Sequence, residues 1–491
     1  MPSLPRHRRA AFLAASALTA AVTLAGPARA GDDEPSGLNY KAGALDLHLG
    51  VDAGLAYYGV KNAGNGTGSN SRTGERNGGR DWFEGFIAPK ADASLDIGTG
   101  SLYGGLRIVG EATRGNGDAA ADSTTSDQPS ATALDNYFLG WKSGDSLSEL
   151  GDDGLDLSVG RQDFSIGDGF LIQDGTIEGQ KRGATILSPR VAFDRTAILR
   201  LNTAPVRADV FHLEGTVNQD RMRGGDAAAT KLYGANVEWF GSTEGDKGRF
   251  EYDDRAWYVG GTAMHLYDAD RGVAASRDGM NVFAARTGGA LFSSLGDGFK
   301  DFGLYSEYAV ERNNDAAAKL SAHAWYVEPQ YTFSALPWTP RISYRYASFS
   351  GDNNSNDGTN HAWDSLYTAG GARGWGTWTQ GEITGNYVVG NSNLNSQSVH
   401  LRAQPTDDLA VGVIYYMFDY DKKPSGVSDS SLMNEVNAYA EWATPVPGLN
   451  ISGLVGAASS GKGRQQELAA SSTDANDRTI WLGELILAYS F

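Results

Sequence analysis

The chain has 491 residues, a formal net charge of −18 at pH 7 and no cysteine. The lack of cysteine excludes a fold held by disulfides, and the negative charge makes the chain as a whole a poor partner for nucleic acid. A mean hydropathy of −0.36 together with 64 glycines, 22 tyrosines and 11 tryptophans fits strands with one polar and one apolar face.

The first thirty residues have the three parts of a secretory signal peptide. Three arginines stand between residues 6 and 9, residues 10–24 form a short apolar run rich in alanine, and Ala28-Arg29-Ala30 is a small-x-small cleavage site. The sequence therefore predicts a signal peptide over 1–30 and an outer-membrane domain over 31–491. Removing the four arginines of the signal changes the net charge from −18 to −22.

From residue 45 onward, apolar and polar residues alternate in segments of about ten residues separated by turn residues. In 45–55 the odd positions are Leu, Val or Ala, while the even positions are Asp, His or Gly; 91–97 and 325–333 repeat this period. No stretch after the signal approaches twenty apolar residues, so the sequence offers no transmembrane helix. A membrane protein made from this chain must be a closed antiparallel β-barrel.

Long polar loops alternate with short turns, as in barrels whose long loops are extracellular and whose turns are periplasmic. Both termini are then periplasmic and the number of strands is even, but counting every segment gives nineteen. We assign 381–389 to the descending arm of a loop over 351–395 and 396–404 to the membrane, which predicts an all-β transmembrane barrel of about 18 strands. The lumen of such a barrel is wider than the side chains of the wall can fill, so the long loops 165–192 and 351–395 are candidates to fold inward.

The last eleven residues, Trp481 to Phe491, form the most distinctive segment. Their alternate positions are apolar and carry aromatic residues at both ends. This pattern resembles the closing strand of outer-membrane barrels, which carries its lipid-facing and interfacial aromatic residues to the last position. It agrees with the exported compartment that the signal peptide predicts.

Strand parity sorts charged residues between lipid and lumen, because a charge facing lipid is costly. Seven basic residues fall between lipid-facing neighbours and are expected to line the lumen: Arg107, Arg200, Arg207, Arg341, Arg345, His400 and Arg402. Carboxylates share that space: Asp46, Asp52, Asp92, Asp96, Glu111, Asp209, Glu238, Glu307, Glu328, Glu435, Glu441 and Glu484. Two interpretations stay open: a hydrogen-bonded network that fixes the wall, and a mixed-charge pathway that attracts and releases a carboxylated solute.

Three segments carry a resemblance to a known family. Val159-Gly160-Arg161-Gln162 ends a strand before a long loop, 343–352 reads SYRYASFSGD, and 363–395 contains two tryptophan-rich stretches before Asn393-Leu394-Asn395. These segments resemble the alginate-export porins of Gram-negative outer membranes. The resemblance implies an 18-stranded barrel whose arginine-lined lumen passes an anionic uronate polymer.

By this resemblance Arg161, Arg345 and Arg402 are pore residues. Arg161, however, has the parity of Leu157 and Val159, which would point it at lipid. Either a bulge precedes Arg161 or the residue lies above the membrane at the base of the loop. The many acidic residues also keep a neutral or mixed oligosaccharide, or a small organic acid, open as the solute.

The charge pattern and the resemblance together predict an outer-membrane channel that passes an anionic polysaccharide such as alginate, or its oligomers, by passive diffusion. The expected partners are that saccharide, outer-membrane lipid and periplasmic export partners, with no nucleic acid and a monomeric state. One alternative is a substrate-selective uptake porin for organic acids or sugars. Another is a plugged structural or adhesin barrel.

The sequence predicts no catalytic, cofactor or metal site. Its seven histidines include His7 in the signal, and the others stand singly without a catalytic partner at a suitable spacing. Residues 352–358 resemble a calcium loop, but the glycine comes one place late and no acidic residue follows at the required distance. An exposed turn explains this segment better.

Overall fold

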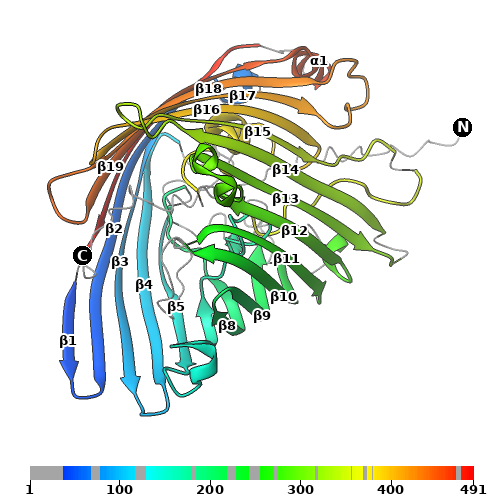
Figure 1. Ribbon diagram of the computed structural model, residues 1–491. Coiled ribbons are helices and arrows are strands. Elements are labelled where there is room, and N and C mark those ends of the chain that lie inside the picture. The colour runs from blue at the N-terminus through cyan, green and yellow to red at the C-terminus, as the bar shows by residue number, and fades with distance from the viewer. Residues whose placement is uncertain are drawn as a thin grey trace, which may run out of the picture.

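The computed structural model describes residues 37–67, 78–117, 129–177, 183–184, 186–217, 228–242, 255–269, 275–315, 319–354, 356–368, 373–378, 380–471 and 477–491. These residues form a β-barrel whose lumen contains further chain segments (Figure 1). The signal peptide expected over 1–30 lies outside the described residues and stays a prediction.

Eighteen strands build the wall within the described residues. They are β2 (Leu45–Lys61), β3 (Gly79–Asp96), β4 (Ser101–Gly115), β5 (Ser130–Lys142), β6 (Leu155–Gln162), β8 (Phe193–Thr203), β9 (Val206–Val217), β10 (Ala228–Ser242), β11 (Arg255–Tyr267), β12 (Asn281–Gly289), β13 (Phe302–Asn313), β14 (Leu320–Thr332), β15 (Arg341–Phe349), β16 (Leu394–Thr406), β17 (Leu409–Tyr420), β18 (Ser431–Ala443), β19 (Leu449–Ser460) and β20 (Ile480–Ser490).

The wall closes on itself. Consecutive wall strands pair antiparallel, and β20 pairs with β2 in a register that sets Leu485 opposite Tyr57. The two-residue strand β7 (Thr176–Ile177) is not part of the wall, since it lies in a loop and pairs parallel with β9. The prediction of a closed antiparallel barrel of about 18 strands is therefore confirmed. In the described part of the chain, no helix is long and apolar enough to span a membrane.

The two faces of the wall follow the period-two pattern of the sequence. Trp481 and Leu485 of β20 and Phe491, which follows it, are 55%, 47% and 42% exposed, whereas Leu482 and Ile486 between them are buried. The exposed face is apolar because it meets lipid, and the buried face packs against segments inside the barrel. The pattern seen in the last eleven residues therefore marks a lipid-facing closing strand.

An additional strand, β1 (Leu38–Ala42), extends the sheet beyond the end of β20. It pairs antiparallel with the first residues of β2, from Leu45 to Leu49. β20 pairs with the same side of β2 from Asp52 onward, and Phe491 exchanges backbone hydrogen bonds with Val51. Strand β1 thus continues the row of β20 toward the end of the barrel where the short turns lie.

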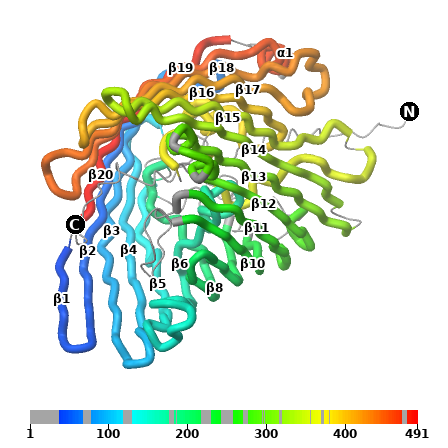
Figure 2. The backbone as a smooth tube through the Cα atoms, viewed as in Figure 1, coloured from blue at the N-terminus to red at the C-terminus, as the bar shows by residue number. Residues whose placement is uncertain are grey.

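Two long connections fold into the lumen, as the loop lengths suggested. Their described residues inside the barrel are 164–177, 183–184 and 186–192 between β6 and β8, and 363–368, 373–378 and 380–393 between β15 and β16 (Figure 2). Residues 381–385 form a short π-helix, η9 (Gly381–Gly385), so the assignment of 381–389 to a loop is correct. The other described helices are η1 (Ala63–Gly66), η2 (Ser148–Leu150), η6 (Ala275–Arg277), η7 (Ser293–Leu295), η8 (Asp297–Phe299) and α1 (Lys462–Ser471).

The two inward loops pack on each other. Ile172 and Tyr367 form a parallel β-bridge, and the Tyr367 carbonyl accepts the amide of Gln173 at 2.8 Å. Phe170 of the first loop packs edge-on against Trp378 of the second, with ring centroids 4.8 Å apart, and all four of Phe170, Tyr367, Trp378 and Ile172 are buried. Apolar packing between loops, not only side chains of the wall, thus fills the centre of the barrel.

Candidate functional site

Buried glutamates of the wall hold the inward loops by their backbone amides. Glu84 of β3 accepts hydrogen bonds from the amides of Ile186 and Leu187 at 2.8 and 2.9 Å. Glu435 of β18 accepts those of Ile383 and Thr384, at the start of η9, at 2.9 and 2.7 Å. A carboxylate that accepts two amides satisfies groups that burial would otherwise leave unpaired.

Two further carboxylates of the wall also accept hydrogen bonds from the inward loops. Glu111 of β4 accepts the Ser188 hydroxyl at 2.7 Å and the Gly183 amide at 3.1 Å. Glu311 of β13 accepts the amide of Asp364 at 3.0 Å. Several acids that strand parity places inside the barrel therefore bind loop segments instead of lining open space. For these residues the geometry agrees with the structural interpretation.

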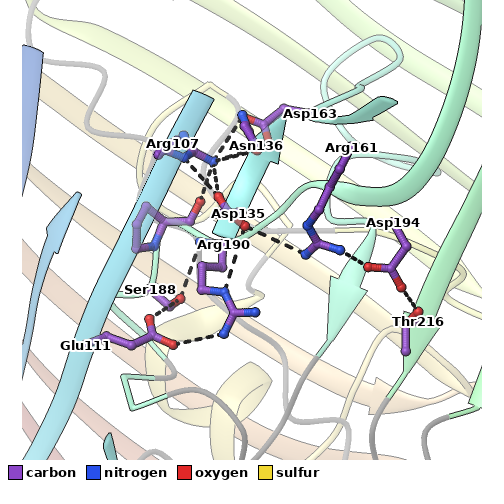
Figure 3. Close-up of polar contacts among 11 residues, drawn as sticks. Arg107, Glu111, Asp135, Asn136, Arg161, Asp163, Ser188, Arg190, Asp194 and Thr216 are labelled. Atoms are coloured by element: carbon purple, nitrogen blue, oxygen red, sulfur yellow. Dashed lines mark hydrogen bonds and ion pairs between the residues drawn. The ribbon is translucent and has the colours of Figure 1, made fainter. Parts of the chain in front are cut away.

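Three arginines surround Asp135, a fully buried carboxylate of β5 (Figure 3). Arg107 Nη2 lies 2.5 Å from Asp135 Oδ2, while Arg161 Nη2 and Arg190 Nε lie 3.7 and 3.8 Å from Oδ1. Arg107 also reaches Asp163 at 3.4 Å. The group joins β4, β5 and β6 to the first inward loop through charges of opposite sign.

Arg161 is buried beside an irregularity in the pairing of β6 with β8. The pairing of β6 with β8 shifts register between Gly160 and Gln162, and Gly160 has φ of 138°, a conformation that side chains other than glycine rarely adopt. The shift leaves one more residue on β8, between Phe193 and Thr196, than on β6, so the bulged residues belong to β8. At this point Arg161 is buried, against the parity of the exposed Val159, and pairs with Asp194. A bulge therefore lies beside Arg161, which is also the last residue but one of β6 and so stands at the base of the loop.

Arg200 and Arg207 share a single acid on the neighbouring strands of the wall, β8 and β9. Arg200 Nε lies 2.7 Å from Asp209 Oδ1, and Arg207 Nε lies 3.4 Å from Oδ2 of the same carboxylate. Asn236 donates a further hydrogen bond to Asp209 at 3.2 Å. Both arginines lie in β8 and β9 on the inward face, as strand parity predicted.

A basic chamber lies between the second inward loop and the wall strands β13 to β17. Its volume is about 100 Å³, and its lining includes three arginines, Arg341, Arg345 and Arg373, with Glu328 as the one carboxylate. Trp375 adds an aromatic surface beside these charges. Guanidinium groups that outnumber the acids give the chamber a positive potential, which favours anions.

Arg345 ties the second loop to the chamber wall. Its Nη1 donates to the carbonyl of Thr377 at 2.5 Å, and its Nη2 donates to the carbonyl of Gly376. The guanidinium lies over the Trp378 ring, 5.0 Å from the centroid, and 3.8 Å from Glu328. Arg345 therefore shapes the chamber as well as contributing to its charge.

The other basic residues expected on β15 and β16 differ in their partners. Arg402 pairs with Glu441 at 2.9 Å, and His400 Nε2 lies 2.8 Å from the Tyr439 hydroxyl. Arg341 stands directly opposite Arg402 in the strand register, and its guanidinium has no hydrogen bond and no ion pair with any described residue. This half-buried guanidinium is the cation of the chamber that is least neutralised by the protein.

Parity reasoning could not find Arg373, since it belongs to a loop. Arg373 Nε lies 3.0 Å from Asp168 of the first loop, its Nη2 lies 2.8 Å from Glu328, and its guanidinium stacks over Tyr305 at 4.1 Å. Strand periodicity says nothing about where a loop side chain points. The available signal was the length of the loop and its tryptophan-rich segment around Trp375.

One acid of η9, Glu382, has a pKa well above its ordinary value. Burial raises the pKa of Glu382 in the second loop to about 8, and the nearby carboxylate of Glu435 adds to the effect. Asn386 Nδ2 donates to the same carboxyl group at 3.3 Å. Glu382 therefore carries a proton at neutral pH while the loop is packed against the wall.

A closed barrel with a basic chamber and inward loops is the architecture of an outer-membrane channel, and comparisons with known proteins agree. The family model described as "Alginate export" matches residues 92–441, so the chain belongs to the alginate export family. None of the curated proteins gave a match. The family places this barrel in the outer membrane.

Solved outer-membrane porins share the fold at low sequence identity. A BenF-like porin from Pseudomonas fluorescens Pf-5 is 10% identical with a TM-score of 0.54, over 91% of this chain and 98% of that one. Pseudomonas aeruginosa OccK7 (OpdD) is 11% identical with a TM-score of 0.52, over 92% and 99%. OccK2 (OpdF) from the same organism is 12% identical with a TM-score of 0.52, over 91% and 97%. At such identities the likeness concerns the fold alone.

Proposed function

We propose that this channel passes a carboxylated polysaccharide such as alginate, or its oligomers, across the outer membrane by passive diffusion. The observation that carries the proposal is the chamber in which three arginines meet one carboxylate and Arg341 lacks an acidic partner. A carboxylate of the solute would supply the missing counter-charge, with Arg341 as the first contact. Membership of the alginate export family supports the same class of solute.

The charged residues around the chamber would make binding weak enough for release. Arg402 and Arg345 already share acids of the wall, so a solute carboxylate competes with Glu441 and Glu328 instead of meeting bare cations. His400, held by Tyr439, offers a ring nitrogen beside this path. Partial neutralisation of each cation lets a polyanion step from one site to the next.

The remaining arginines of the lumen would have a structural role and not bind solute: Arg107, Arg161, Arg200 and Arg207. Each of them has a carboxylate partner within the barrel, so we assign them to the charge-paired wall that surrounds the path and not to direct binding of solute. Their part in conduction is to keep the register and the charge balance of that wall.

The second inward loop has to move for a sugar to pass. The volume of the chamber, about 100 Å³, is below the range of roughly 300–1,000 Å³ that is typical of sites for small molecules. The contacts that Glu435, Arg345 and Arg373 make with this loop would then set how easily the path widens. No cofactor and no energy source belong to this proposal; direction follows the gradient or periplasmic partners, and the barrel acts as a monomer.

A substrate-selective uptake porin for small organic acids is the second candidate. The small volume of the chamber favours it, since a monocarboxylate needs less displacement of the loop than a polymer does. The porins that share the fold leave both candidates open, because their likeness concerns the fold alone.

The reversal potential of the refolded protein in a planar bilayer under a salt gradient tests the proposal. We expect preference for anions and block of the current by added oligouronate. The double variant Arg341→Gln with Arg402→Gln should lose most of both effects. Arg312→Gln is the matched control, because Arg312 is exposed on the outer face of β13.

Three results would count against the proposal. Unchanged selectivity of the double variant in an open pore removes the assignment of these arginines. Anion preference with block by small organic acids but not by oligouronate favours the uptake porin. Absence of any conductance favours the plugged barrel.

A further inference from the structure

The lipid-facing wall is hollow at one place, over the extracellular halves of β3, β4 and β5. The groove has a volume of about 570 Å³. On the outward face it is lined by Gly85, Gly110, Ala112, Ser130 and Thr132, and its lining also includes residues of the opposite parity on the same strands, such as Phe86 and Ala131. Ile87, 58% exposed, stands at its edge.

Strand geometry does not require the glycines of this groove. A Cβ at Gly85 would lie 3.4 Å from its nearest neighbour atom and one at Gly110 would lie 3.8 Å away, which are ordinary contacts. At Gly104 of the same sheet, by contrast, a Cβ would come within 2.6 Å of the Phe138 carbonyl oxygen. Neither Gly85 nor Gly110 has a positive φ. The hollow is therefore space that larger apolar side chains could fill.

A cation stands at the extracellular end of the groove. Arg114 is two residues beyond Ala112 on the outward face of β4, a step of about 7 Å along a strand. Its Nη1 donates to the carbonyls of Thr113 at 2.6 Å and Pro129 at 3.4 Å, which keeps the exposed guanidinium beside Ser130. A planar guanidinium at this height matches the phosphate of a lipid headgroup.

The hydroxyls of Ser130 and Thr132 are a second polar feature of the groove. Both side chains are exposed on the face that meets lipid, and neither has a hydrogen-bond partner among the described residues. Hydroxyls at such positions would find partners in the ester or amide linkages that join acyl chains to a headgroup.

The position of the outward-facing cations indicates which leaflet of the membrane the groove faces. Among wall side chains that the structure describes, the outward-facing lysines and arginines all lie at the loop ends of their strands: Lys61, Arg114, Arg195, Lys231 and Arg312. Arg195 and Lys231 pair there with Glu214 and Asp268. The groove lies next to Arg114, on the side of the long loops.

We propose that this groove binds a phosphorylated lipid of the outward-facing leaflet. One acyl chain lies along Gly85, Gly110 and Ala112, the linkage of the chain meets Ser130 and Thr132, and the phosphate pairs with Arg114. Burial of the acyl chain supplies affinity, and the phosphate–guanidinium pair supplies selectivity for a phosphorylated headgroup. The site is on the outer wall, so it is independent of the chamber and of the proposed solute.

Native mass spectrometry of the detergent-solubilised full chain tests the proposal with two probes that have identical acyl chains, phosphatidic acid and diacylglycerol. We expect one phosphatidic acid to be retained, and diacylglycerol to be retained more weakly. Gly110→Leu fills the groove and should lower retention of both lipids at least tenfold. Arg114→Gln should lower retention of phosphatidic acid to the level of diacylglycerol and leave diacylglycerol unchanged.

Gly483→Leu is the matched control, because Gly483 also faces outward, on β20, and a Cβ there meets nothing within 4 Å. Retention should equal that of the unmodified chain. If Gly110→Leu fails to give the heat-modifiable folded band on a gel, the double variant Gly85→Ala with Gly110→Ala replaces it and should weaken retention several-fold. Equal retention by groove and control variants, or equal retention of the two lipids, overturns the proposal.

Discussion

Arginines gather at two places inside the barrel, around Asp135 and around Arg341, and the two places differ in the number of acids beside them. The first holds Arg107, Arg161 and Arg190 together with four carboxylates: Glu111, Asp135, Asp163 and Asp194 (Figure 3). The second holds Arg341, Arg345 and Arg373 with two carboxylates by the same criterion of ion pairs, Glu328 and Asp168. An inward arginine is therefore a structural residue or a candidate binding residue according to its acidic neighbours, not according to its parity.

Removal of the acid at the centre of the balanced group should have the largest effect on stability. Asp135→Asn leaves three guanidinium groups around a neutral side chain, and breaking a buried ion pair costs about 3–5 kcal/mol. Urea unfolding in detergent should show this loss, while ion selectivity of the remaining folded channels stays unchanged. If Asp135→Asn shifted ion selectivity as much as Arg341→Gln does, the arginines around Asp135 would also belong to the conduction path, and the distinction between the two groups would be wrong.

Release of the second loop should have the next largest effect. In Glu435→Gln one carboxylate oxygen becomes an NH₂ group that cannot accept an amide, so one of the two hydrogen bonds to η9 is lost at about 1–3 kcal/mol. We expect higher single-channel conductance, because the loop that closes the chamber is held less tightly. Glu214→Gln, on the outer face of β9, is the control. Conductance that does not exceed the control would mean that this loop does not limit the path.

Arg341→Gln should separate charge from stability. Arg341 has no ion pair to lose, so the free energy of unfolding should change by about 0.5 kcal/mol or less. Anion preference, measured as the reversal potential, should nevertheless fall several-fold. The reverse outcome, a destabilised barrel with intact selectivity, would place Arg341 with the structural arginines.

The smallest expected effect is the pH dependence of the stability of the packed second loop. Because the pKa of Glu382 is about 8 in the packed loop and near 4.5 when the loop is exposed, the packed loop binds the proton more tightly. Its stability is therefore full below the ordinary pKa and declines as pH rises toward about 8. Channel open probability should rise over this range, and Glu382→Gln should remove the dependence. An unchanged pH profile in the variant assigns the titration to another group.

The wall could be predicted from the sequence because its signal is local. The alternation in 45–55 and in 481–491, and the even parity of the strands, gave the closed barrel and the number of wall strands. A lipid face on one side and a packed face on the other impose a period of two on each strand separately. Six of the seven residues placed inward by parity also meet a partner inside the barrel, Arg341 being the exception.

Local rules failed where a single residue changes the register or where the chain leaves the wall. The register shift between β6 and β8 lies beside Arg161, which is buried against its expected parity, and no alternation pattern in the sequence predicts this shift. Arg190, Asp168 and Arg373 belong to loops, so only the packing of these loops brings their charges into the lumen. The acids of the wall likewise acquired their role from amides more than fifty residues away in the sequence.

The sequence by itself determined the barrel, its lipid-facing bands, the inward position of most charges and the resemblance to a family of channels. These properties follow from patterns within single strands and from the cost of placing charge in lipid. Only the tertiary structure decided which arginines are neutralised, which acids hold the loops and where the outer wall is left hollow. Those outcomes depend on contacts between distant segments, and a pairing that joins Asp168 to Arg373 or Glu84 to Leu187 has no trace in local periodicity.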